Sequence, residues 1–362
     1  MTFPLWFYVS IFVVSAAASL TVLNIVRRRQ LLDIPNARSS HNLPTPKGGG
    51  LGFAAIIATV FIASGALSNS ASGSAVMVLG ITALALAITG LVDDLRPLAS
   101  STRMLIQLLA GLVIVFVLPR TSVDLGFMRL SPVAAACLAL LFLLWMTNLY
   151  NFMDGIDGIA SFQAILLGAG IYCLDALALY SGNLAGLALV IATCVGGFLL
   201  FNFPPAKIFM GDVGSVFLGF TLAAIALFEG ADAIENLWIW LILMAVFICD
   251  ATATLLARLA QRQKLYQAHR SHIYQLYTQT VAHNLTTTGM TAEQARAQAH
   301  RRYLIWFSLC FSLVQFPLAI AVAARWLPGL PVALFTYGLL IVGFISLGAG
   351  RDRLALCKGN PS

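Results

Sequence analysis

The chain has 362 residues, of which 60% are hydrophobic and only 10% are charged, and its formal net charge is +7. Soluble globular proteins carry roughly 25% charged residues, so this composition excludes a water-soluble globular protein. Apolar stretches of the length that crosses a bilayer as a helix, about 20 residues, recur along the whole chain and leave no room for a separate soluble domain.

We therefore expect an all-α polytopic membrane protein that forms a single transmembrane domain over residues 1–362, with about eleven spanning helices. In chain order the apolar runs are 4–26, 49–67, 74–92, 104–118, 131–147, 159–180, 183–201, 213–229, 237–256, 303–323 and 331–348. The first run has no Lys or Arg before it and is followed by Arg27, Arg28 and Arg29. This is the reverse of a cleavable signal peptide, and it predicts a retained anchor.

The distribution of basic residues predicts the orientation of the chain. With the N-terminus outside and the C-terminus inside, the inner loops contain 18 Lys and Arg residues and the outer loops contain three. This asymmetry satisfies the positive-inside rule. The net positive charge then follows from topology and from attraction to anionic lipid headgroups, so nucleic-acid binding is not expected.

The first inner loop, residues 33–53, reads DIPNARSSHNLPTPKGGGLGF. Gly48 to Gly50 open the second apolar run, where free backbone N–H groups and the helix dipole favour an anion such as phosphate. Lys47 adds a positive charge beside them. The alternative interpretation is a loop that needs glycine flexibility and proline stiffness where a helix begins.

The next inner segment, LVDDLRP, ends an apolar run with two adjacent carboxylates, Asp93 and Asp94. Carboxylates are unfavourable at the C-terminal end of a helix dipole, which indicates a functional reason for them. Together with Arg96 and Arg103 they suit a site for magnesium and phosphates, since hard divalent cations prefer oxygen ligands. A solvated helix end is the alternative.

The segment NLYNFMDGIDGIAS, residues 148–161, carries Asn148, Asn151, Asp154 and Asp157 between two apolar runs. The last three of these repeat every third residue. This spacing predicts three oxygen-bearing side chains on one side of a helical turn, more than capping alone would require.

The segment FNFPPAKIFMGDVGSVFLGF, residues 201–220, places Asp212 and Ser215 around a glycine-rich helix start. We expect an anion or metal-phosphate site there, with Phe209 offering a ring on which a base stacks. The alternative is that Asp212 only caps the eighth span, because Asp is a favoured N-cap residue.

The longest inner loop contains QAHRSHIYQ, residues 267–275. His269 and His272, with Arg270, are suited to binding a diphosphate or protonating a leaving group. A zinc pair and a charged loop on the membrane surface are the alternatives. Asp250 lies inside the ninth run, where an ionisable group indicates function or a buried pair.

Taken in this order, the five segments resemble the polyprenyl-phosphate N-acetylhexosamine-1-phosphate transferases, also called glycosyltransferase family 4, over residues 33–275. The resemblance implies an enzyme of the bacterial inner membrane whose active site faces the cytoplasm and uses Mg²⁺, with Mn²⁺ as the alternative metal. In the implied reaction, the phosphate of undecaprenyl phosphate attacks the sugar-proximal phosphorus of a UDP-sugar and releases UMP. Direct attack, with Asp93 orienting or deprotonating the lipid phosphate, is our hypothesis, and a covalent enzyme intermediate is the alternative.

The resemblance also implies that the inner loops 27–48, 93–103, 148–158, 202–213 and 257–302 form the active site. The residues expected to be catalytic and to hold the metal are Asp93, Asp94 and Asp212. Those expected to bind substrate are Lys47, Arg103, Asn148, Asn151, Asp154, Asp157, Asn202, Phe209, Ser215, His269, Arg270 and His272. Among these, Phe209 is expected to stack on uracil.

The histidine segment bears on the choice of sugar. The muramyl-peptide branch of this family has three consecutive histidines where this chain reads His269-Arg270-Ser271-His272. The difference argues against the peptidoglycan precursor as the substrate. The sequence HRSH is more similar to the branch that starts O-antigen synthesis with N-acetylated amino or deoxyamino sugars. The alternative functions are a peptidoglycan-precursor phosphotransferase and an ion-coupled transporter. Besides the substrates, the expected partners are membrane lipid and a second copy of the chain in a homodimer.

Overall fold

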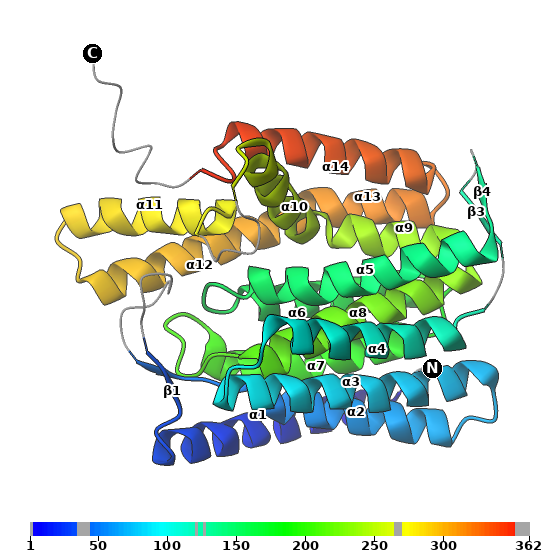
Figure 1. Ribbon diagram of the computed structural model, residues 1–362, viewed down its shortest axis with the longest axis horizontal. Helices are drawn as coiled ribbons and strands as arrows, with labels where there is room; N and C mark the ends of the chain where they lie inside the picture. The colour runs from blue at the N-terminus through cyan, green and yellow to red at the C-terminus, as the bar shows by residue number, and fades with distance from the viewer. Residues whose placement is uncertain (1–2, 35–43, 120–121, 126–127, 264–269, 352–362) are drawn as a thin grey trace.

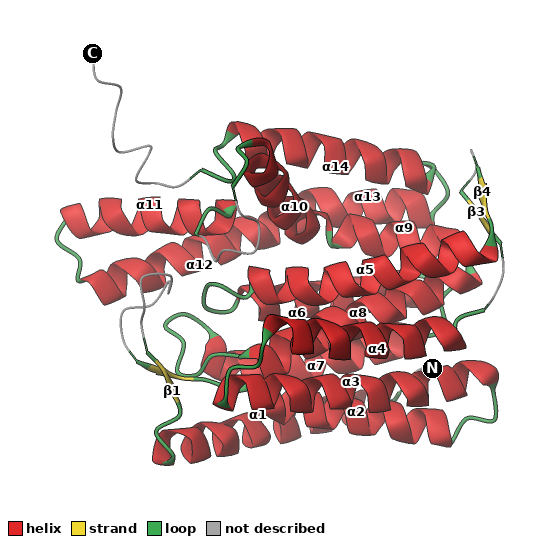
Figure 2. Cartoon of the chain, in the orientation of Figure 1, coloured by secondary structure: helices red, strands yellow, loops and turns green. Residues whose placement is uncertain are grey.

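The computed structural model describes residues 3–34, 44–119, 122–125, 128–263 and 270–351, which fold as a bundle of long helices lying side by side (Figures 1 and 2). The helices of the first half are α1 (Leu5–Arg28), α2 (Gly50–Ala66), α3 (Ala71–Leu95), α4 (Ser100–Val117), α5 (Pro132–Met153), α6 (Ile159–Ala176) and α7 (Ala185–Asn202). Those of the second half are α8 (Asp212–Asp232), α9 (Ile234–Leu243), α10 (Ala245–Ala260), α11 (Ile273–Thr287), α12 (Ala292–Cys310), the π-helical turn η1 (Phe311–Gln315), α13 (Phe316–Ala323) and α14 (Gly329–Ser346).

Two short antiparallel hairpins join these helices. β1 (Leu32–Asp33) pairs with β2 (Thr45–Pro46), and β3 (Val123–Asp124) pairs with β4 (Arg129–Leu130). β1 lies at one end of the bundle, and the hairpin of β3 and β4 lies at the opposite end (Figure 1).

The membrane spans agree with the sequence prediction of an all-α polytopic protein. Within the described ranges, nine helical segments have the length and hydropathy of a membrane span, and α9 with α10 forms a tenth that is bent by 72°. The shorter apolar helix α2, of 17 residues, coincides with the remaining predicted run. Each of the eleven predicted runs therefore falls on a helix, but the ninth, 237–256, is not the straight span that we expected.

Two glutamines satisfy the backbone at the bend between α9 and α10. The amide of Gln315 donates to the carbonyls of Ile242 and Leu243 at 3.0 and 3.2 Å, and the amide of Gln163 donates to Leu243 at 3.3 Å. A carbonyl without a partner in the hydrocarbon region costs several kcal/mol. These side chains therefore stabilise the bend, which hydropathy alone does not reveal.

The predicted inner loop 257–302 is largely helical, which corrects the sequence interpretation. α11 and the first part of α12 form a hairpin that extends beyond the neighbouring helix ends at the left of Figure 1. Thr291 and Gln294 form a capping box at the start of α12, a motif that satisfies two free backbone donors of a helix. The search for apolar runs missed these helices because their sequences are mostly polar.

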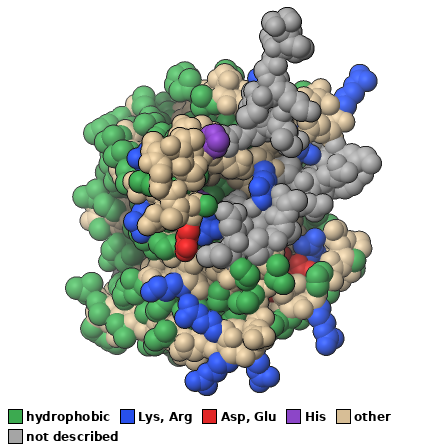
Figure 3. All heavy atoms as spheres, turned by 90° about the vertical axis from the view of Figure 1, so that its left-hand side faces the viewer, with side chains coloured by type: hydrophobic (Ala, Val, Ile, Leu, Met, Phe, Trp, Pro, Cys, Tyr) green, Lys and Arg blue, Asp and Glu red, His purple; other side chains and the backbone are tan. Residues whose placement is uncertain are grey.

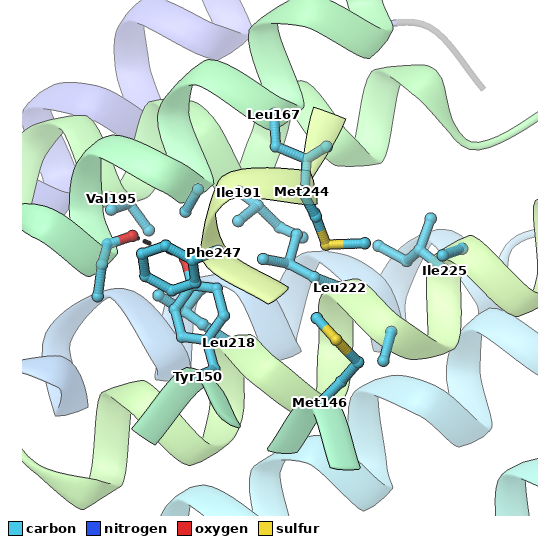
Figure 4. Close-up of a cluster of buried hydrophobic side chains, with 14 of the residues drawn as sticks. Met146, Tyr150, Leu167, Ile191, Val195, Leu218, Leu222, Ile225, Met244 and Phe247 are labelled. Carbon is cyan, nitrogen blue, oxygen red and sulfur yellow. Dashed lines mark hydrogen bonds between the residues drawn. The ribbon is translucent and has the colours of Figure 1, made fainter. Parts of the chain in front are cut away.

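α8 lies at the centre of the bundle, and 16 of its 21 residues are buried. Glycines allow its neighbours to approach closely: a Cβ at Gly219 would lie 2.7 Å from the Met146 carbonyl of α5, and a Cβ at Gly90 would lie 2.6 Å from the Asp212 backbone. Figure 4 shows the apolar side chains that fill the space around α8, among them Tyr150 of α5 and Phe247 of α10. This packing sets the ends of α3, α5 and α8 against one another.

At the other end of α8, the buried side chain of Glu229 caps the neighbouring helix α7. Its Oε1 accepts the backbone N–H groups of Asn183 at 2.9 Å and Leu184 at 2.6 Å. Only 1% of Glu229 and 5% of Leu184 are exposed, so the Leu184 donor has little access to water, whereas Asn183 is exposed. Asp232, one turn further along, instead accepts a hydrogen bond from the Asn183 side chain at the exposed surface.

Glu229→Ala is expected to lower the free energy of unfolding by about 2 kcal/mol, because the orphaned buried N–H of Leu184 costs roughly 1–3 kcal/mol. Thermal unfolding in detergent is the measurement, with Asp232→Ala as the control. The control should leave the melting temperature nearly unchanged. Equal melting temperatures for the two variants would contradict the capping role.

Candidate active site

Four of the five sequence motifs meet at the end of the bundle where α8 begins. In the space-filling view of this end (Figure 3), Lys and Arg side chains are spread over the surface and acidic side chains lie among them. The charged residues in contact are Lys47 before α2, Asp93 and Asp94 at the end of α3, Arg103 in α4, and Asp212 at the start of α8. We refer to these five residues as the charged cluster.

Asp94 caps α8 from a different helix. Its two carboxylate oxygens accept the backbone N–H groups of Asp212 and Val213 at 3.1 and 3.2 Å. A carboxylate is favourable at a helix N-terminus, where unpaired N–H groups and the dipole are positive. α8 begins at Asp212 and its N-cap is Gly211, so Asp212 is the first helical residue and the alternative interpretation, in which it serves as the N-cap, is wrong.

Asp93 and Asp212 are held together by Arg103. The guanidinium Nη1 of Arg103 lies 3.0 Å from Oδ2 of Asp93 and 3.7 Å from Oδ2 of Asp212. Asp93 also accepts the Leu98 N–H at 2.6 Å. These contacts fix Asp93 at the helix end, where two neighbouring negative charges alone would repel.

Lys47 completes the charged cluster from the other side. Its ammonium lies 2.7 Å from Asp94 and 3.8 Å from Asp212. Burial alone would lower the pKa of Lys47, but the Asp94 and Asp212 carboxylates outweigh burial and hold that pKa above its usual range. Lys47 therefore keeps its positive charge throughout the physiological pH range.

The backbone next to Lys47 is paired with the loop before α8. The N–H of Phe209 donates to the Pro46 carbonyl at 2.8 Å, and the N–H groups of Gly49 and Gly50 donate to the carbonyls of Phe209 and Met210 at 2.9 Å each. The prediction that the glycines before α2 offer free N–H groups to an anion is therefore wrong for Gly49 and Gly50. Their role is close packing, because a Cβ at Gly50 would lie 2.3 Å from the backbone of Gly214.

Asn151, in the last turn of α5, connects α5 to the charged cluster. Its amide donates to Oδ1 of Asp212 at 3.1 Å and to the hydroxyl of Ser215 at 2.9 Å. Ser215 is buried and donates in turn to the Gly211 carbonyl. Both predicted residues thus lie where they orient Asp212.

The predicted row of Asn151, Asp154 and Asp157 on one helical turn is wrong, because α5 ends at Met153. Asp154 lies next to the charged cluster, and burial and the charge of Asp212 raise its pKa well above the usual range. Asp157 instead accepts the Ala206 N–H at 3.1 Å and lies 3.3 Å from His300. Burial would raise the pKa of Asp157, but the bond from His300 holds it below the usual range.

Two predicted asparagines have their contacts elsewhere. Asn148 donates to Gln107 of α4 at 2.7 Å. Asn202 donates to the Ile208 carbonyl and accepts the Gly158 N–H, so it ties the loop before α6 to the loop before α8. Asn148 thus joins α5 to α4, and Asn202 supports the loops beside the charged cluster.

The fifth motif lies against α10. His272 precedes α11 and is buried, with Nδ1 3.6 Å from Oδ1 of Asp250. Arg270 is partly buried, and burial lowers its pKa. His269 lies outside the described residues, so its predicted role is untested. Asp250, whose partner the sequence did not reveal, is fully buried and caps α11 by accepting the Ile273 N–H.

Sequence reasoning missed several residues that support the site. His300 binds Asp157 across 143 positions of sequence, and Arg301 donates to the Pro204 carbonyl at 2.9 Å while lying over the Phe203 ring. The only available signal was the basic run His300-Arg301-Arg302 before an apolar run. Sequence reasoning also missed Tyr274, whose hydroxyl donates to the Phe152 carbonyl at 3.0 Å.

The charges around Asp212 do not balance. Among the described residues, four carboxyl groups, those of Asp93, Asp94, Asp154 and Asp212, lie near two cations, Lys47 and Arg103. In this part of the chain, no three His, Cys, Asp or Glu side chains converge as a ready-made metal cage. Asp93 and Asp212, which both contact the Arg103 guanidinium, are the residues that could hold a metal ion.

Comparison with known proteins identifies the family of this chain. The sequence model of glycosyl transferase family 4 matches residues 76–229. A protein of Bacillus subtilis named as a probable undecaprenyl-phosphate N-acetylglucosaminyl 1-phosphate transferase is 30% identical over 282 residues, which are 73% of this chain and 75% of that protein.

Two further relatives carry related names. The decaprenyl-phosphate N-acetylglucosaminephosphotransferase of Mycobacterium leprae is 27% identical over 81% of this chain and 77% of its own length. A phospho-N-acetylmuramoyl-pentapeptide-transferase of Streptococcus pneumoniae is 31% identical over 59% of this chain and 66% of its own length. The chain therefore belongs to the polyprenyl-phosphate N-acetylhexosamine-1-phosphate transferase family of membrane enzymes.

Proposed function

We propose that this protein transfers an N-acetylated amino or deoxyamino sugar 1-phosphate from a UDP-sugar to undecaprenyl phosphate. The observation that carries the proposal is the charged cluster, which brings three carboxylates and two cations from separate segments to the start of α8. The family to which the chain belongs and the names of its relatives support the reaction class.

The exposed parts of the charged cluster suit a ligand that carries phosphates. The side chains of Lys47 and Arg103 are 33% and 41% exposed, while that of Asp94 is only 4% exposed. Asp212 is 21% exposed. The two cations can therefore meet phosphate oxygens, Lys47 as a point charge and Arg103 through its planar fork, while Asp94 stays behind them as a support.

The proposed reaction needs positioning more than proton transfer. An oxygen of the lipid phosphate forms a bond to the sugar-proximal phosphorus, and the bond from that phosphorus to the bridging oxygen breaks, so UMP leaves with that oxygen. A phosphomonoester has a second pKa near 6, so a dianionic lipid phosphate attacks without losing a proton. Positive charge and alignment are then the main contributions, as in other phosphoryl transfers.

In this scheme Asp93 orients the lipid phosphate instead of acting as a strong base. The Leu98 N–H and Arg103 hold its carboxylate in place, which limits the motion that would weaken alignment. Direct attack remains our proposal. The isolation of a sugar-phosphate adduct on an aspartate from quenched enzyme would instead support the covalent route.

We also propose that Mg²⁺, with Mn²⁺ as the alternative, binds at Asp212 and Asp93, with Asp94 behind them. Asp93, Asp94 and Asp212 outnumber Lys47 and Arg103, the cations that contact them among the described residues, and this surplus of carboxylates fits a divalent cation. Mg²⁺ sites commonly use one or two carboxylates together with substrate phosphates, so a site without a complete protein cage is suitable. The bound ion would neutralise charge that develops on the phosphate oxygens.

The nucleotide is proposed to bind beside the charged cluster. Asn151, Asp154 and Asp157 border this region on the side of α5, and the partly buried Phe209 lies on the adjoining loop. We keep the proposal that Phe209 stacks on uracil and that Arg270 and the histidines contact the diphosphate.

We further propose that the protein lies in the bacterial inner membrane, with this end facing the cytoplasm, and that it forms a homodimer.

Two alternatives predict different activities. An ion-coupled transporter would need acidic residues along a path across the membrane, whereas the acids of the charged cluster lie at one end and Asp250 caps a helix. A peptidoglycan-precursor phosphotransferase is compatible with the relative from Streptococcus pneumoniae. We favour initiation of O-antigen or a related envelope glycan because residues 269–272 read HRSH.

Asp212→Asn and Asp93→Asn are each expected to lower kcat at least about 100-fold, because they remove charge that the transition state requires. UMP release from a UDP-sugar in the presence of undecaprenyl phosphate is the measurement. Asp175→Asn, near the opposite end of α6, is the control and should retain the wild-type rate. Near-normal rates in the first two variants would overturn the site assignment.

Chelation with EDTA should abolish turnover, and added Mg²⁺ should restore it. Ca²⁺ should restore it poorly, because Ca²⁺ prefers six to eight oxygen ligands at longer distances. The concentration of Mg²⁺ that gives half-maximal activity is the quantity to measure. Full activity of the purified enzyme after exhaustive chelation would exclude the proposed metal.

The sugar is identified with a panel of UDP-GlcNAc, UDP-GalNAc, UDP-FucNAc, UDP-QuiNAc and UDP-MurNAc-pentapeptide. We expect turnover with one of the first four and none with the last. Release of UMP should require lipid phosphate in every case. Preferred use of the pentapeptide would support the peptidoglycan alternative and reject the O-antigen assignment.

A further inference from the structure

Asp250 fixes the start of α11. It is completely buried in α10, and its two oxygens accept the backbone N–H groups of Ile273 at 2.8 Å and Tyr274 at 3.1 Å. Two N–H bonds at a helix start satisfy donors that otherwise have no partner within the helix. The carbonyl of Ser271 accepts the Gly350 N–H at 2.9 Å, so the chain that enters α11 is held from the segment after α14 as well.

Tyr274 carries this arrangement to the end of α5. Its ring is fully buried, and its hydroxyl donates to the Phe152 carbonyl at 3.0 Å. Burial and the charges of Asp250 and Asp154 raise the pKa of Tyr274 well above its usual range, so the hydroxyl keeps its proton. Gly155 leaves the required space, because a Cβ there would lie 2.0 Å from the Tyr274 hydroxyl.

The end of α5 then meets the charged cluster. Asn151, next to Phe152 in the chain, donates to Asp212 at 3.1 Å and to Ser215 at 2.9 Å. A continuous set of hydrogen bonds and one peptide link therefore connects Asp250 of α10 to Asp212. Buried networks of this kind hold side chains in one arrangement when each member is satisfied.

We propose that Asp250 and Tyr274 are positioning residues for the transfer reaction, which set the last turn of α5 so that the Asn151 amide meets Asp212. The inference rests on the proposed function of the charged cluster. Both residues act through other groups: Asp250 through the backbone of α11, and Tyr274 through the carbonyl of Phe152. The proposal assigns Asp250, the ionisable residue of the ninth predicted span, to the transfer reaction and not to ion transport.

Tyr274→Phe is the sharpest test, because it keeps the buried ring and removes only the hydroxyl. Tyr337→Phe is a matched control: its hydroxyl also donates to a helix carbonyl, that of Leu241, at 3.0 Å, but it joins α14 to α9. We expect kcat to fall about tenfold in Tyr274→Phe, with a smaller change in KM for the UDP-sugar. Tyr337→Phe should lose similar thermal stability and keep the wild-type kcat.

A double-mutant cycle tests whether the two residues act together. In Asp250→Asn, one acceptor oxygen becomes an NH₂ group that faces a backbone donor, so the start of α11 should shift. Effects of residues in one network are not additive. The double variant Asp250→Asn with Tyr274→Phe is therefore expected to be no slower than the slower single variant, and a multiplicative loss would reject a shared path.

Hydrogen exchange provides a readout that does not depend on activity. Amides at the end of α5, residues 147–153, should exchange faster in Tyr274→Phe than in the wild type or in Tyr337→Phe. If wild-type protein releases no UMP from any tested UDP-sugar, the proposed function fails while the exchange result still tests the connection. Wild-type kcat with unchanged exchange in Tyr274→Phe would overturn the positioning role.

Gly155→Ala covers the case in which Tyr274→Phe is poorly folded. The added methyl group would clash with the Tyr274 hydroxyl and displace it from the Phe152 carbonyl, while the tyrosine itself is retained. It should reproduce the loss of kcat and the faster exchange of residues 147–153. A normal kcat in a variant whose exchange is faster would separate the connection from catalysis and reject the proposal.

Discussion

The bond from the Asp94 carboxylate to the first two N–H groups of α8 is the interaction on which the active end of this molecule depends. It brings the C-terminal end of α3, where the dipole is negative, against the N-terminal end of α8, where it is positive. Each helix end therefore reduces the electrostatic cost of the other. Gly90 makes the approach sterically feasible, since a Cβ there would clash with the backbone of Asp212.

Around this contact the protein gathers more negative charge than its own cations neutralise. Such a site is costly without a ligand, as the raised pKa of Asp154 shows. The cost is local, because the buried core of α8 and the capped start of α7 stabilise the rest of the bundle. Stability and chemistry are thereby separated between the two ends of α8, with Glu229 at one end and Asp212 at the other.

Local patterns in the sequence predicted the spans and most of the charged cluster. Apolar runs identify helices because the bilayer admits few alternatives, and Asp93, Asp94 and Asp212 stood out because carboxylates are rare in such a chain. The bend between α9 and α10 could not be predicted, since it depends on Gln163 and Gln315 from distant helices. The prediction that side chains from Asn151 to Asp157 form a row on one helical turn is wrong, because α5 ends at Met153. No local signal in the sequence reveals the bond between His300 and Asp157.

The bend between α9 and α10 has a consequence for how the protein is made. Both halves are apolar, so they can enter the bilayer from the translocation machinery as one straight segment. Gln315, which binds the Ile242 carbonyl, lies 73 residues further along the chain and emerges from the ribosome later. Because the carbonyls of Ile242 and Leu243 need partners within the hydrocarbon, we infer that α10 takes its final tilt only after η1, which carries Gln315, has joined the bundle. The shape of the ninth span is thus completed by a segment that is synthesised after it.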